Sequence, residues 1–211
     1  SAPHPTRRPH RDAQTMIDTR RYQWMIGGIG LLLVIAFSVF MFLAPARSNR
    51  PGVRAGRPLH RFVAPLATSN LNVPANVAPR CNPARPARRG LNVCDRAPLV
   101  LAFFATDAKP CIRAVNSLQR LSTGYPGTVF AAVALGGAKA PTLALVRKHR
   151  WTIRVAYDSS GAVAQLYDVP VCPMIEVAGR GGIVKRLLIG DRWAQPAALA
   201  AALGSALSRR G

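Results

Sequence analysis

The feature that most constrains this chain is an alternation of short apolar runs and amphipathic segments over residues 98–207. The runs PLVLAFFAT (98–106) and TVFAAVAL (128–135) are apolar at almost every position, as in strands buried on both faces of a sheet. The segment 109–121 repeats apolar residues at helical spacing, and Pro110 suits its first turn. Strands that alternate with helices in this way predict an α/β domain.

The same pattern continues to the C-terminus. A turn signal at 180–182 separates two apolar segments, which predicts a hairpin. The element order is then β-α-β-α-β-α-β-β-α, and we expect a three-layer α/β domain over residues 98–211. After the first helix and second strand, the expected elements are a helix at 140–149, a strand at 152–158, a short helix at 162–167, strands at 174–179 and 183–190, and a helix at 195–207.

A second apolar feature lies near the N-terminus. Residues 25–44 are MIGGIGLLLVIAFSVFMFLA and carry no charge. A helix of this length spans roughly 30 Å, about the thickness of a hydrocarbon core, so we predict one transmembrane helix that contacts membrane lipid. A cleaved signal peptide is the alternative, because Ala44-Pro45-Ala46 resembles a cleavage site. The apolar run is longer than the roughly 7–15 residues of a signal sequence.

The flanking segments suggest an orientation without proving it. Residues 1–24 are polar and basic, and we predict a disordered cytoplasmic head. Residues 45–97 carry more arginine than the head, so a positive-inside count alone does not decide the topology. We place the C-terminal domain outside the cytoplasm because its cysteines suit an oxidising compartment. The prediction is therefore a single-pass cell-membrane protein, and the opposite topology stays open.

Residues 45–97 are rich in proline and arginine and show little periodicity. They predict an extended, semi-stiff tether between the apolar segment and the domain. Its arginines could bind acidic lipid, or the tether could be a soluble spacer.

The net charge of +21 suits anionic partners, but 25 of the 29 basic residues are arginine, as in proteins from GC-rich genomes. We expect no nucleic-acid partner. The four histidines are scattered, and we expect no metal and no cofactor.

The four cysteines are Cys81, Cys94, Cys111 and Cys172, and their spacing matches no zinc, haem or C-x-x-C pattern. Cys81 and Cys94 flank a basic, proline-rich loop, and we predict a structural disulfide between them. Closing a loop of this size stabilises a protein by roughly 3 kcal/mol.

Two stretches of the sequence resemble the thioredoxin superfamily, in particular the membrane-anchored TlpA/ResA-like thiol–disulfide proteins. LAFFATDAKPCIRAVNSLQRL (101–121) is similar to the strand, active site and helix of that family. RVAYDSSGAVAQLYDVPVCPMIEVAGRGGIVKRLLIG (154–190) is similar to its later strand, D-x-x-G turn, cis-proline and hairpin. The resemblance covers about residues 98–208, and the anchor and tether fit the same family.

The resemblance implies a degenerate active site. Cys111 falls on the second, buried cysteine of the family motif, while Ala108 occupies the position of the attacking cysteine and Asp107 that of the usual tryptophan. An alanine supplies no thiolate, so the standard mechanism is missing. A peroxiredoxin-type site fails for the same reason.

The family's cis-proline falls on Pro173, and the preceding Cys172 then lies across the same pocket as Cys111. One hypothesis is that Cys111 and Cys172 form a relocated redox pair, with Pro173 shaping the substrate groove. The other is a static disulfide or two unrelated buried thiols. Asp107 is an acid or base at the pocket, or an exposed helix cap. A further alternative has Cys81 or Cys94 supplying the missing nucleophile to Cys111.

Together these features predict a membrane-anchored, extracytoplasmic thioredoxin-like protein with atypical or lost thiol–disulfide exchange. The alternative is a non-catalytic accessory subunit that binds a protein partner in the membrane or cell envelope through the same groove. Fold alone does not separate the two, because function depends on the site.

Overall fold

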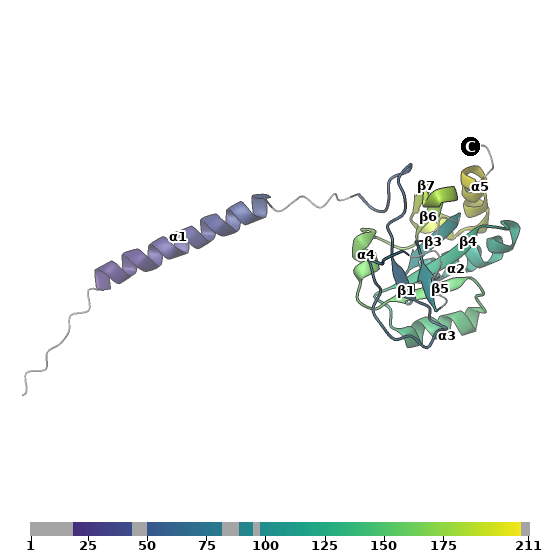
Figure 1. The fold of residues 1–211 in the computed structure, drawn as a ribbon, viewed down its shortest axis with the longest axis horizontal. Helices are drawn as coiled ribbons and strands as arrows, with labels where there is room; N and C mark the ends of the chain where they lie inside the picture. Colours follow the sequence, from purple (N-terminus) through teal and green to yellow (C-terminus); the bar gives the residue numbers. More distant parts are fainter. Residues whose placement is uncertain (1–18, 44–49, 82–88, 95–97, 208–211) are drawn as a thin grey trace, which may run out of the picture. The chain divides into compact units, whose positions relative to one another are not determined.

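The computed structural model of the chain describes residues 19–43, 50–81, 89–94 and 98–207. The chain divides into two compact units, Ser1–Ser48 and Asn49–Gly211. The described part of the first unit is one helix, and the second unit holds every strand that the structure describes (Figure 1).

The helix of the first unit, α1, runs from Thr19 to Leu43. The side chains of residues 26–39 are exposed. Residues 19–24 belong to this helix and correct the prediction of a disordered head at these positions, while residues 1–18 lie outside the described part. Neither proline nor glycine occurs between residues 10 and 26, so no helix breaker precedes the apolar segment.

Among the residues that the structure describes, none of the helices combines the length and the apolar character that crossing a membrane requires.

The centre of the second unit is a five-stranded mixed sheet with the order β5-β4-β3-β6-β7. The three strands β3, β4 and β5 are parallel, and β6 and β7 run antiparallel to them. All six residues of β3 are buried, as expected for the middle of a covered sheet. The strands are β3 (Leu99–Phe104), β4 (Val129–Leu135), β5 (Arg154–Asp158), β6 (Met174–Ala178) and β7 (Val184–Ile189).

Three helices cover one face of this sheet. They are α2 (Lys109–Leu121), α3 (Lys139–His149) and α5 (Pro196–Leu207). Val115 and Leu118 of α2 and Leu199 of α5 are buried in one apolar cluster with residues of β3, β4 and β6. The sequence predicted α2 at its exact bounds and the other two helices within one residue of their ends.

The opposite face of the sheet is covered mainly by the N-terminal part of the second unit. The short helix α4 (Ala162–Leu166) contributes Val163 to this layer. The rest comes from residues upstream of β3, including the two-stranded antiparallel sheet of β1 (Val63–Pro65) and β2 (Gly90–Asn92). Its fully or almost fully buried side chains are Val53, Leu59, Phe62, Ala64, Leu91 and Val93.

This packing corrects the prediction of an extended tether over 45–97. Residues 50–81 and 89–94 fold onto the domain, whereas 44–49, 82–88 and 95–97 lie outside the described part. The physical reason is that a sheet of fully apolar strands must be covered on both faces. The short α4 is too small for that task, so the proline-rich segment supplies the missing layer. It also pairs with the β5 edge, where the Ala67 N–H donates to the Val155 carbonyl at 2.9 Å.

Candidate functional site

Cys111 lies in the first turn of α2, directly after the loop that follows β3. Ala108 is the N-cap residue in extended conformation, and its carbonyl accepts the N–H of Cys111 at 3.1 Å and that of Ile112 at 3.1 Å. Pro110 occupies the first turn, where its missing N–H costs nothing. The side chain of Cys111 is only 1% exposed and packs into the apolar cluster beneath the helix.

Cys172 lies in the loop between α4 and β6 and is partly exposed. The peptide bond between Cys172 and Pro173 is cis, as the resemblance implied for this proline. The Pro173 carbonyl accepts the Gly190 N–H at 2.9 Å, which ties this loop to the segment after β7. The loop is therefore attached to the sheet through β6, which follows it, and to the segment after β7 through this hydrogen bond.

Cys111 and Cys172 form a disulfide, with Cα atoms 5.5 Å apart and a sequence separation of 61 positions. The sheet explains why such distant residues meet. Phe103 near the end of β3 pairs with Met174 at the start of the antiparallel strand β6. The residues that follow β3 and those that precede β6 therefore emerge at the same edge of the sheet.

The two cysteines of this disulfide differ in their exposure to solvent. Cys172 is partly exposed, whereas Cys111 is buried. An incoming thiolate needs access to the sulfur that it attacks, so Cys172 is the accessible end of the bond. The leaving thiolate would then form on Cys111, where the N-terminal end of α2 stabilises negative charge.

Asp107 is exposed and does not cap α2. The N-cap residue is Ala108, and no side chain makes a capping hydrogen bond at this end. The prediction that Asp107 caps the helix is therefore wrong, because the helix begins one residue later than a capping aspartate would require.

Cys81 and Cys94 form the second disulfide, with Cα atoms 5.4 Å apart. The bridge spans 13 positions and encloses β2, so it links the two ends of this part of the covering layer. Both cysteines are engaged with each other, and every cysteine of the chain lies in one of the two disulfides. This pairing removes the alternative in which Cys81 or Cys94 acts on Cys111.

Glu176 is a buried carboxylate that the sequence reasoning missed. It lies in the middle of β6 and is fully buried, with its Oε1 accepting the Val53 N–H at 2.6 Å and its Oε2 lacking a partner among the described residues. Burial raises the pKa of Glu176 to about 7, and the hydrogen bond from Val53 lowers it only in part. The signal in the sequence was a single acidic residue inside the apolar run MIEVA.

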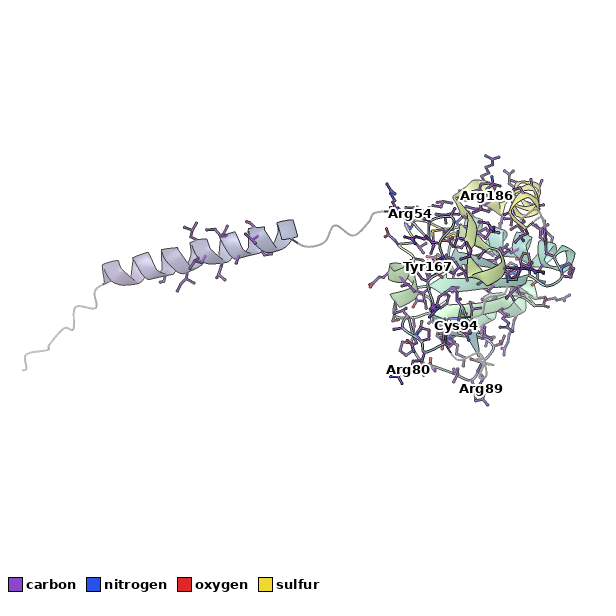
Figure 2. All side chains as sticks on the ribbon, turned by 45° about the horizontal axis from the view of Figure 1, so that its top comes forward. Arg54, Arg80, Arg89, Cys94, Tyr167 and Arg186 are labelled. Atoms are coloured by element: carbon purple, nitrogen blue, oxygen red, sulfur yellow. A yellow bond between two sulfur atoms is a disulfide. The ribbon has the colours of Figure 1, made fainter. Side chains whose placement is uncertain are left out.

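Glu176 belongs to the layer opposite α2, among Val53, Tyr167 and Leu187, and not to the disulfide. Burial and the nearby Glu176 carboxylate both raise the pKa of Tyr167, whose hydroxyl donates to the His60 carbonyl at 2.7 Å. Figure 2 shows Tyr167 inside the domain, while Arg54 and Arg186 extend from its surface. Glu176 is thus a structural group that links the covering layer to the sheet.

A second buried carboxylate has a local structural role. Asp158 ends β5 and accepts the N–H groups of Val163 and Ala164 at 2.9 and 3.0 Å. These are donors of the first turn of α4 that have no partner within the helix. Asp158 thereby fixes the D-x-x-G turn and the start of the loop that leads to Cys172.

The sheet order, the helix after β3 that carries a cysteine and the cis-proline opposite it define a thioredoxin-like fold. The structure of a protein described as thiol:disulfide interchange protein DsbE from Chlorobium tepidum is similar, with 20% identity and a TM-score of 0.55 over 72% of this chain and 99% of that one. A thiol-disulfide oxidoreductase from Bacteroides fragilis gives 16% identity and a TM-score of 0.53, over 73% of this chain and 100% of that one.

Peroxidoxin BcpB from Mycobacterium tuberculosis is also similar, with 14% identity and a TM-score of 0.56, over 75% of this chain and 99% of that one. No protein-family model and no curated relative matches the sequence. At these identities the structural likeness establishes the fold, and the activity must be argued from the site.

Proposed function

We propose that this protein is a membrane-anchored, extracytoplasmic thiol–disulfide exchange protein whose redox pair is Cys111 and Cys172. The observation that carries the proposal is the disulfide between the first turn of α2 and the residue before the cis-proline. It joins an accessible sulfur to a buried sulfur at a helix N-terminus, which are the two environments that disulfide exchange needs.

The exchange runs through Cys172. A thiolate of a substrate dithiol attacks the Cys172 sulfur, the bond to Cys111 breaks, and its electron pair leaves with the Cys111 sulfur. The second substrate thiolate attacks the substrate sulfur of this mixed disulfide and releases the Cys172 thiolate. Two electrons and two protons have then passed to the chain, and the substrate holds the disulfide. In the reverse direction the Cys172 thiolate opens a substrate disulfide.

This order is the reverse of the roles in the usual motif. There the attacking cysteine begins the helix, a position that alanine occupies in this chain at residue 108. The attacking group is instead supplied from the loop before β6. Activity of this kind is atypical because accessible and buried cysteines lie on different elements, although they meet at one edge of the sheet.

A non-catalytic role remains the competing proposal, and one observation favours it. The Cys111 side chain is 1% exposed and lies in the apolar core, so reduction would leave a thiol in a packed environment. In that case the disulfide is structural, and the domain serves as an accessory subunit that binds a protein partner in the membrane or cell envelope.

A redox titration separates the two proposals. The full-length chain is equilibrated in detergent with glutathione or dithiothreitol buffers, trapped by alkylation, and analysed by peptide mass spectrometry. Exchange activity requires Cys111–Cys172 to open within the range of known exchange proteins, roughly −270 to −120 mV. A bond that stays closed below about −300 mV is structural and rejects the redox role. The Cys81–Cys94 bridge in the same samples is the internal control.

The membrane anchor is proposed from residues 25–44, which carry no charge and are apolar around the whole helix circumference. Alkaline carbonate extraction should leave the full-length chain in the membrane pellet. Arginine at both Val34 and Ile35 costs roughly 2.5–3.5 kcal/mol for each residue at the centre of a span, and this variant should be released. Recovery of the wild-type chain in the supernatant would contradict the anchor.

The extracytoplasmic location of the domain has its own test. A membrane-impermeant amine reagent applied to intact cells should modify exposed lysines such as Lys148 and Lys185. Labelling that appears only after the cells are broken would place the domain in the cytoplasm.

A further inference from the structure

A basic cavity lies between α2 and the 3₁₀ segment η3 (Asp191–Ala194) that precedes α5. Its volume is about 520 Å³. Six of its eight lining residues have polar or charged side chains, and we call the cavity the arginine pocket. They are Arg113, Asn116, Arg120, Asp191, Arg192 and Gln195.

The pocket carries an excess of positive charge that the described residues do not neutralise. Three guanidinium groups face one carboxylate, that of Asp191. Among the described residues, the structure records no ion pair for Arg113, Arg120 or Arg192. Exposed arginines are common in this basic chain, but here three of them converge on one cavity, and their charge is available to a ligand.

Two of these arginines are held in position. The Nη2–H of Arg120 donates to the Ser117 hydroxyl at 3.2 Å. The buried Ser117 hydroxyl donates in turn to the Ala194 carbonyl at 2.9 Å. The Arg192 guanidinium lies 5.2 Å from the ring centroid of Trp193. Side chains that are fixed before binding lose less conformational entropy when a ligand arrives.

The amide of Asn116 adds a neutral donor. Its Oδ1 accepts the Trp151 Nε1–H at 2.7 Å, which leaves the NH₂ group without a partner among the described residues. Arginine forks and an amide NH₂ are the donors that carboxylates accept in protein recognition.

Part of the positive charge of the pocket lies at the N-terminal end of α2, where a cation is electrostatically unfavourable. Lys109 and Arg113 lie in or next to its first turn, which contains no acidic residue. Cations at this end of a helix are disfavoured by the macrodipole, and a bound anion offsets that cost.

The arginine pocket and the Cys111–Cys172 disulfide are built on the same segments of the chain. Arg113 is two residues beyond Cys111 on α2. On the other wall, Asp191 follows Gly190, whose N–H donates to the carbonyl of the cis-proline Pro173. We take these two connections to mean that a polypeptide presenting a sulfur to Cys172 can reach the pocket with a neighbouring segment.

We propose that the arginine pocket binds the carboxylates of an acidic segment in the polypeptide whose cysteines exchange with Cys111–Cys172. The inference rests on the proposed function and names the substrate class of that site. A peptide fits better than a free inorganic anion, because about 520 Å³ lies in the range of roughly 300–1,000 Å³ that drug-sized ligands occupy.

Binding is tested with a probe that cannot react. A fluorescein-labelled peptide with several aspartates, and with serine in place of cysteine, is titrated onto the full-length chain in detergent, and anisotropy is measured. The double variant Arg113→Gln/Arg192→Gln should bind the peptide roughly tenfold more weakly than wild type, a loss expected from removing charge-assisted hydrogen bonds. Double variant Arg147→Gln/Arg154→Gln removes the same charge from exposed residues of α3 and β5 and should bind like wild type.

Three outcomes would overturn the inference. Equal loss in both double variants would show that only net charge matters. Equal affinity for a peptide with asparagine at each aspartate would show that carboxylates are not recognised. Displacement of the peptide by inorganic phosphate at the peptide's own concentration would assign the pocket to small anions.

The redox titration is repeated on both double variants, which retain all four cysteines. Both double variants should cycle like wild type, whereas a wild-type chain whose disulfide cycles but which does not bind the acidic peptide rejects the inference alone. Selective peptide binding beside an inert disulfide supports carboxylate recognition and rejects the exchange function.

Discussion

The backbone N–H of Val53 donates to Oε1 of Glu176 at 2.6 Å, across 123 positions of sequence. This bond joins the first residues of the folded unit to the middle of β6. Gly52, next to Val53, donates its N–H to the Tyr167 carbonyl at 2.7 Å and approaches the same carboxylate so closely that a side chain there would collide with it. The N-terminal segment is thus fastened to the sheet at a titratable group.

The Glu176 carboxylate should make stability depend on pH. Burial raises the pKa of Glu176 in the folded state to about 7, from 4.5 in the unfolded chain. Its contribution to the free energy of unfolding is complete below about pH 4.5 and falls as pH rises towards 7. The loss is on the order of 3 kcal/mol, because each pKa unit corresponds to about 1.4 kcal/mol. Urea unfolding of the full-length chain in detergent between pH 4 and pH 8 measures it.

The variant Glu176→Gln should remove this dependence, because its amide oxygen still accepts the Val53 N–H and carries no charge. It should therefore be more stable than wild type at pH 8 and similar at pH 4. The exposed Asp168→Asn is the control and should follow wild type at both values. Parallel curves for wild type and Glu176→Gln would show that Glu176 does not titrate in this range.

Single cysteine variants should differ sharply in reactivity. In Cys111→Ser the remaining Cys172 is partly exposed, and it should form a mixed disulfide with glutathione and react readily with maleimide. In Cys172→Ser the remaining Cys111 is 1% exposed, and its reaction rate should be about one tenth of that of Cys172 or lower. Mass-shift assays on native protein measure both rates, with urea-unfolded samples as the control. Equal native rates would contradict the assignment of Cys172 as the accessible sulfur.

The covering layer should contribute strongly to stability. Phe62 is fully buried, and its ring meets that of Tyr167 edge-on at 5.8 Å. Phe62→Ala should lower the free energy of unfolding by roughly 3–5 kcal/mol, as for other large-to-small changes in a core. The neighbouring Arg61 is exposed, and Arg61→Ala should change the free energy of unfolding by less than about 0.5 kcal/mol. If the two variants were equally stable in urea, the segment would be the loose tether that the sequence predicted.

The Cys81–Cys94 bridge should be structural and separable from exchange. Replacing both cysteines with alanine should reduce stability by roughly 3 kcal/mol, the value for a closed loop of about this length. The potential of Cys111–Cys172 should not change, because the two bridges share no residue. A shifted potential in the redox titration of this variant would show that the bridges are coupled.

Much of the fold followed from local sequence patterns. The helix at 109–121 was predicted at both ends because its apolar spacing, Pro110 and the flanking strand all agree. The strands of the central sheet were recognised because buried parallel strands are apolar at every position. The resemblance, rather than spacing alone, placed Pro173 and Cys172 opposite Cys111, and the structure contains that disulfide and that cis-proline.

What the sequence by itself determined was therefore the order of strands and helices along the chain and, through the resemblance, the placement of Cys172 and Pro173 opposite Cys111, since these depend on residues near each other or on a recognisable motif. Only the tertiary structure decided that residues 50–81 cover the second face of the sheet and that Glu176 is buried beneath Val53. It also decided that Cys172 is the exposed end of its disulfide, and that three arginines from α2 and η3 share one cavity. These properties depend on which distant segments meet, and irregular, proline-rich stretches show no periodicity from which such contacts can be predicted.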